Sequence, residues 1–168
     1  YNISTTLQAF TGVESYESGN VPSDNVKNVR DLWLQWRAKA DRYYPLSSKL
    51  TLGVYGELAF SNRSLLRNYT VSLIQAPAFR PTPYTRTVFK DAFSANKYAA
   101  IGVKPIYNFT KDFHARCEAY WFVPYETINR ASDNSAYYSK PFTSSQVMVE
   151  TSLVYNFKIA SAGLFANY

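Results

Sequence analysis

Hydrophobic and polar residues alternate along most of the chain with a period of two, which is typical of β-strands whose two faces meet different surroundings. The alternation is sharpest over residues 113–123, where Phe113, Cys117 and Trp121 share one face. The same pattern predicts strands over residues 32–41, 50–60, 99–108, 145–157 and 160–166, and a weaker one over residues 7–13. We therefore expect an all-β, antiparallel chain with about seven or eight strands.

The predicted connections differ in length at the two ends of the sheet. Short turns fall at residues 44–48, 109–112 and 156–158, whereas long loops fall at about 17–28, 61–97 and 124–143. Short turns at one end and long loops at the other are typical of an up-and-down outer-membrane β-barrel. Because single-chain bacterial barrels have an even number of strands, we expect residues 1–168 to form a single barrel domain or the carboxyl-terminal part of a larger barrel.

The charged residues indicate which face of the strands would meet lipid. Arginine or lysine on the lipid face costs about 2–4 kcal/mol at the middle of a bilayer, so we expect the polar rows to face a watery lumen and the apolar rows to face lipid. The alternative is a soluble barrel or sandwich that binds an apolar ligand and encloses the rows containing Trp36, Leu52 and Trp121. The predicted lumen-facing residues are Gln35, Arg37, Lys39, Asp41, Glu57, His114, Arg116, Glu118 and Glu150.

Composition narrows the possible classes of protein. The 15 tyrosines, 11 phenylalanines and 3 tryptophans supply too much apolar area for a disordered chain. The longest charge-free run is Tyr1–Val13, which is too short for a spanning helix of roughly 18–20 apolar residues. The chain has one cysteine and one histidine, which excludes a disulfide framework and the usual zinc sites.

No motif in the sequence predicts catalysis. His114 is not paired with a serine or cysteine by any recognisable spacing, and Cys117 lies on an apolar face, where an inert role is expected. We therefore expect no catalytic residues, no cofactor and no metal. The chain begins without methionine or a signal segment, so we expect a processed product or an excised fragment.

Most of the net charge of +6 falls in the long loop over residues 61–97, which has six basic residues and the single acid Asp91. Such a loop could bind phosphates of lipopolysaccharide, fold back over the lumen as a plug, or remain solvated without a partner. Membrane lipid or lipopolysaccharide, a second copy of the chain, or the missing remainder of a barrel are the expected partners, and nucleic acid is not expected. The candidate phosphate-binding residues are Arg63, Arg67, Arg80, Arg86 and Lys90.

Several segments carry a resemblance to a known family. They are Asn68-Tyr69-Thr70, Ala76-Pro77-Ala78-Phe79 followed by Pro81-Thr82-Pro83, Phe93-Ser94-Ala95-Asn96, the strand from Gly102 to Tyr107, and the strand segment from Arg116 to Tyr120. Over residues 32–168 the chain resembles the carboxyl-terminal surface-antigen-type barrel of patatin-like phospholipases from Bacteroides-type bacteria. The resemblance implies a bacterial outer-membrane location and an upstream lipase domain, which this barrel segment would anchor and could also translocate or orient. The G-x-S-x-G and Asp-Gly motifs of the lipase domain are absent, so we expect this chain to be non-catalytic.

Overall fold

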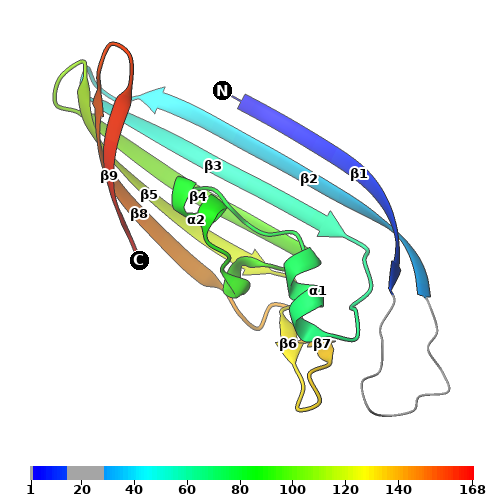
Figure 1. The fold of residues 1–168 in the computed structure, drawn as a ribbon. Coiled ribbons are helices and arrows are strands. Elements are labelled where there is room, and N and C mark those ends of the chain that lie inside the picture. Colours follow the sequence, from blue (N-terminus) through cyan, green and yellow to red (C-terminus); the bar gives the residue numbers. More distant parts are fainter. Residues whose placement is uncertain (1, 15–28) are drawn as a thin grey trace.

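The computed structural model describes residues 2–14 and 29–168, and its main feature is one antiparallel sheet (Figure 1). Seven strands lie in the order β1-β2-β3-β4-β5-β8-β9. Their bounds are β1 Asn2–Glu14, β2 Val29–Pro45, β3 Leu50–Ser61, β4 Lys97–Asn108, β5 Phe113–Pro124, β8 Gln146–Asn156 and β9 Ser161–Asn167. The predicted all-β antiparallel class is confirmed, and each of the seven predicted strands has its counterpart. The predicted loop at 17–28 lies outside the described residues.

The sheet is open rather than closed into a barrel. Each strand pairs with the next strand of the sheet in an antiparallel register, from β1 with β2 to β8 with β9. Within the described residues β1 and β9 do not pair with each other, and each has one neighbour in the sheet. Figure 1 shows a curved sheet with α1 and α2 against one side. An open sheet is compatible with the second of the two expected forms, in which the chain is part of a barrel.

Short elements interrupt two of the long connections. Helix α1 (Tyr69–Gln75), helix α2 (Pro83–Thr87) and the 3-10 turn η1 (Asp91–Phe93) lie between β3 and β4. The Asn68 side chain accepts a 3.2 Å bond from the amide of Val71, which fixes the start of α1. A small hairpin of β6 (Ile128–Arg130) and β7 (Ala136–Tyr138) lies in the connection before β8, where the sequence predicted only a loop.

The two faces of the sheet bury different residues. One face of the sheet carries rows of apolar, solvent-accessible side chains, with Trp36 37% and Trp121 48% exposed. We call this the outward face, and the opposite face, which α1 and α2 cover, the inner face. The inner face holds the main buried apolar cluster, whose members include Tyr55, Tyr98, Tyr120 and Phe122. The strong apolar rows seen in the sequence therefore lie on the exposed side, and a second, aromatic set forms the core on the other.

Gly102 in β4 makes room for the buried ring of Tyr120. A Cβ at residue 102 would overlap that ring and lie 3.1 Å from the carbonyl oxygen of Ala119. Because Tyr120 is 2% exposed and cannot move aside freely, we expect Gly102→Ala to lower the free energy of unfolding by about 1–3 kcal/mol. Urea unfolding measured in detergent micelles checks this value. Gly56→Ala is the matched control, since a Cβ there meets no atom within 4 Å; equal stability of the two variants would contradict the prediction.

Candidate functional site

The structure places the nine predicted lumen-facing residues on the inner face of the sheet, where they alternate with the outward rows. Three of them are buried carboxylates: Glu57 in β3 is 2% exposed, Glu118 in β5 is 5% exposed and Glu150 in β8 is 1% exposed. The expectation of a watery surface around these groups is wrong, because the segment between β3 and β4 covers this face. The other six are half-buried: Gln35, Arg37, Lys39, Asp41, His114 and Arg116.

Glu57 lies at the centre of a network of polar groups. The hydroxyl of Tyr98 donates a 2.6 Å hydrogen bond to its carboxylate, and the hydroxyl of Tyr55 donates a second bond. Nε of Arg37 lies 3.3 Å from one carboxylate oxygen and Nζ of Lys39 lies 3.6 Å from the other. Two hydroxyls and two cations offset the desolvation of this buried charge.

Two further ion pairs lie on the inner face. Glu118 accepts a 2.5 Å bond from the hydroxyl of Tyr120 and lies 2.8 Å from Nε of Arg116. Asp41 lies 2.8 Å from Nζ of Lys104, a buried cation of β4 that the sequence-based list of lumen residues omitted. The alternation of β4 could have predicted that Lys104 lies on the inner face, because it is on the face opposite Ile101 and Val103.

Glu150 lacks the partners that the other two buried carboxylates have. It lies directly across from Glu118 in the β5–β8 register. Neither of its carboxylate oxygens has a hydrogen-bond partner among the described residues, and both are buried.

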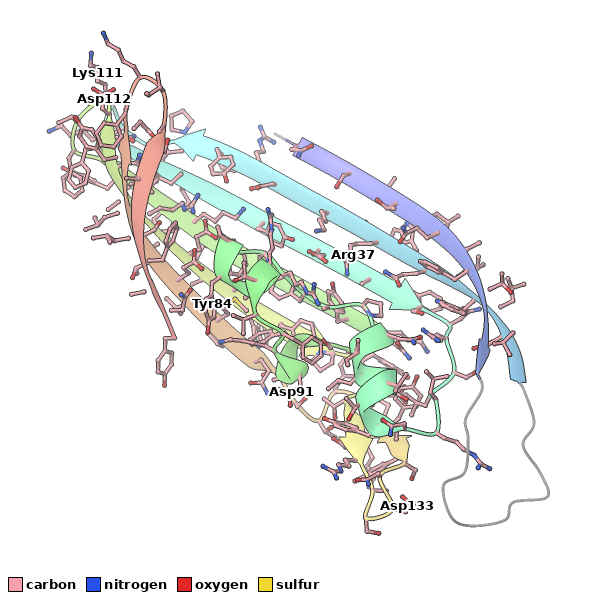
Figure 2. All side chains as sticks on the ribbon, in the orientation of Figure 1. Arg37, Tyr84, Asp91, Lys111, Asp112 and Asp133 are labelled. Atoms are coloured by element: carbon pink, nitrogen blue, oxygen red, sulfur yellow. The ribbon has the colours of Figure 1, made fainter. Side chains whose placement is uncertain are left out.

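Phe79 joins the segment of residues 61–97 to the inner face of the sheet. Its side chain is 1% exposed, and its ring lies at centroid distances of 5.6 Å from Phe122, 5.7 Å from Tyr120 and 6.1 Å from Tyr98. The neighbouring carbonyl oxygen of Ala78 accepts a 3.1 Å bond from Arg37, which is labelled in Figure 2. The segment therefore folds back over the sheet and is held there by both apolar and polar contacts.

The five basic candidates of this segment lie in different settings. Arg67, Arg80 and Arg86 are exposed. Lys90 is half-buried, with its ammonium 5.2 Å from the ring centroid of Tyr84. Arg63 is half-buried as well, with its guanidinium 3.9 Å from the ring centroid of Trp33.

Arg63 lines a polar pocket of about 240 Å³ between the end of β3, the start of β4 and the β6–β7 hairpin. We call it the rim pocket. Its other lining residues are Ser61, Asn62, Ser64, Asn96, Lys97, Glu126 and Tyr138. Of these eight residues, only Arg63 was predicted from the sequence as a binding residue, because the pocket combines residues 61–64 with Asn96, Lys97, Glu126 and Tyr138, which lie in distant parts of the chain.

Hydrogen bonds and ring contacts fix the walls of the rim pocket. The amide nitrogen of the Asn96 side chain donates to the carbonyl oxygen of Arg63 at 3.0 Å and to the hydroxyl of Tyr138 at 2.6 Å. Nζ of Lys97 lies 5.5 Å from the ring centroid of Phe60 and 5.4 Å from that of Tyr125. Burial raises the pKa of the Tyr138 phenol above its ordinary value, so this hydroxyl stays protonated at neutral pH.

A metal site is not evident among the described residues. Within residues 2–14 and 29–168, no three histidine, cysteine, aspartate or glutamate side chains lie close enough together to hold a metal ion. None of the helices in these ranges has the length and apolar character needed to cross a membrane.

Comparisons with protein families, with curated proteins and with solved structures found no match for this chain.

Proposed function

We propose that this chain is a non-catalytic segment of a bacterial outer-membrane β-barrel. The observation that carries the proposal is the continuous apolar surface on the outward side of the sheet. Large apolar side chains on this side are exposed in each of the seven strands of the main sheet. They include Leu7, Leu34, Leu58, Ile101, Trp121, Val147 and Leu164. Soluble monomers rarely expose an apolar surface of this extent, whereas hydrocarbon would cover it without any need for complementary side chains.

The distribution of charge supports the same proposal. Four ion pairs join cations of the inner face to carboxylates of the same face, and these cations are Arg37, Lys39, Lys104 and Arg116. Each of these cations would cost about 2–4 kcal/mol on the lipid side at mid-bilayer. Their placement on the covered face avoids that cost.

Aromatic clusters at the short-turn end would suit a membrane interface. The ring of Phe109 lies 5.1 Å from that of Tyr107 and 4.9 Å from that of Phe113, and Tyr155 lies 4.8 Å from Phe157. Tyrosine and phenylalanine rings gather at the level of the lipid headgroups in membrane barrels. This cluster supports a placement in which the short turns lie at one surface of the membrane.

The role of the barrel segment is proposed from the sequence resemblance. The resemblance over residues 32–168 implies that the segment anchors a patatin-like lipase in the outer membrane, and could also translocate or orient it. Lipid or lipopolysaccharide would then be its natural partner, and further strands or a second copy would pair with the edges of β1 and β9.

A second candidate function is the binding of an apolar ligand by a soluble sheet. The outward face has a shallow hollow of about 440 Å³ lined by Val54, Ile101, Trp121 and Val147 among others, which is large enough for part of an acyl chain. If the protein is such a soluble ligand-binding sheet, it would remain soluble and monomeric without detergent.

Tryptophan quenching by lipid separates the two functions. Trp121 lies on the outward face, whereas Trp33 lies on the other face, stacked on Phe10 at 5.2 Å. In vesicles that contain lipids brominated on their acyl chains, we expect strong quenching of a variant that keeps only Trp121. A variant that keeps only Trp33 should be quenched at most half as strongly. Equal quenching of the two variants, or a protein that stays soluble and monomeric without detergent, would contradict the membrane proposal.

A further inference from the structure

We infer that the rim pocket binds a phosphorylated sugar. The pocket lies where β3 ends and β4 begins, next to the hairpin that carries Tyr138. This is the end of the sheet with the long connections. Figure 2 shows the hairpin, marked by Asp133, at the end of the molecule opposite Lys111 and Asp112.

Two cations of the rim pocket are oriented by aromatic rings. The guanidinium of Arg63 stacks on Trp33, and the ammonium of Lys97 lies over Phe60 and Tyr125. The ion pairs of the described residues do not include Lys97. Rings orient a cation without neutralising it, so Lys97 keeps its charge available for a phosphate oxygen.

The remaining polar groups fit the hydroxyls of a sugar. Glu126 lines the same pocket, and its carboxylate would repel a bare phosphate but accept hydrogen bonds from sugar hydroxyls. The side chain of Ser64 is exposed at the pocket and can both donate and accept. A lining with two cations, one carboxylate and hydroxyl groups therefore matches a ligand that carries both a phosphate and several hydroxyls.

Hydrogen bonds within the protein fix the wall of the rim pocket. Asn96 is 5% exposed, and its bonds to Arg63 and Tyr138 tie the loop after β3 to the hairpin. A preformed wall lowers the entropy lost on binding. The volume of about 240 Å³ is below the roughly 300–1,000 Å³ typical of drug-sized ligands, so the pocket suits one phosphorylated sugar unit.

That unit could belong to a lipopolysaccharide headgroup or be a free sugar phosphate. The lipid source rests on the proposed function, since it requires the pocket to lie at the membrane surface. Binding of a free sugar phosphate does not depend on the proposed function. The shared chemistry is a phosphate attached to a hydroxylated ring, and titrations with two probes separate the sources.

Calorimetric titration of the purified chain in detergent micelles tests the inference. The first probe is glucose 1-phosphate, compared with glucose and with inorganic phosphate, and we expect each of the latter two to bind at least tenfold more weakly. The second probe is lipid A in mixed micelles, with phosphatidylcholine micelles as the blank. Lys97→Met should weaken binding at least tenfold for whichever of the two probes binds the wild-type chain. The control Lys111→Met removes the same charge from an exposed turn at the other end and should change affinity less than twofold.

A second variant keeps the test independent of the stability of Lys97→Met. Ser64→Trp leaves the charge unchanged and fills the exposed side of the pocket, so it should weaken binding to a similar extent. Binding of either probe that both variants weaken supports the inference, and the probe that binds identifies the source. Absence of binding to both probes, equal losses with Lys97→Met and Lys111→Met, or inorganic phosphate binding as well as glucose 1-phosphate would overturn it. If the same protein passes the Trp121 quenching test, such a result refutes the sugar site and leaves the membrane proposal standing.

Discussion

Replacing Phe79 with alanine is expected to lower the free energy of unfolding by about 3–5 kcal/mol. The ring is 1% exposed and contacts aromatic side chains of three strands, namely Tyr55 in β3, Tyr98 in β4, and Tyr120 and Phe122 in β5. Alanine would remove this burial and leave a cavity between the segment 61–97 and the sheet. Urea unfolding in detergent micelles, followed by tyrosine and tryptophan fluorescence, measures the change.

The same substitution should release the segment 61–97 from the inner face. We expect trypsin to cut after Arg86 and Lys90 at least tenfold faster in Phe79→Ala than in the wild-type chain, because cleavage needs local unfolding of the backbone. Phe89→Ala is the matched control, since Phe89 belongs to the same segment and is 44% exposed. Its expected loss of stability is below about 1 kcal/mol. If the two variants lose the same stability and are cut at the same rate, Phe79 does not anchor the segment.

The strands were predictable because one local pattern determines them. In β5, apolar and polar residues alternate for a full strand length, and β9 follows from the outward row of Ala162, Leu164 and Ala166, which the register places opposite Tyr155, Leu153 and Thr151. The start of α1 was equally local, since Asn68 caps its own helix. Such features need no knowledge of distant residues.

The inner face was less predictable because it depends on a segment without periodicity. Phe79 occurs between prolines in a basic loop, and nothing in its neighbourhood indicates that it packs on Tyr120, 41 positions away in the sequence. For the same reason the carboxylate of Glu57 was expected in water, although the returning segment buries it. The rim pocket combines residues 61–64, 96–97, 126 and 138, so only the folded chain brings it together.

Glu57→Ala is the second substitution with a large expected effect, a loss of about 3–5 kcal/mol in the free energy of unfolding. The carboxylate is the acceptor for the buried hydroxyls of Tyr55 and Tyr98, and each hydroxyl left without an acceptor costs about 1–3 kcal/mol. Arg37 and Lys39 would lose their nearest negative charge, although both are partly exposed and can be solvated. Most of the loss should therefore come from the tyrosines rather than from the cations.

A double-mutant cycle separates these two contributions. Glu57→Gln keeps an oxygen that can accept from tyrosine and removes the charge, so we expect it to lose only about 1–2 kcal/mol. Combining Glu57→Ala with Tyr98→Phe should be at least about 1 kcal/mol less destabilising than the sum of the single variants, because the unsatisfied hydroxyl is then absent. Asp112→Asn, a charge removal at the short-turn end, should change stability by less than about 0.5 kcal/mol. If Glu57→Gln is as unstable as Glu57→Ala and the cycle shows no coupling, the cations and not the hydroxyls determine why this carboxylate is buried, and Arg37→Met should then reproduce most of the loss.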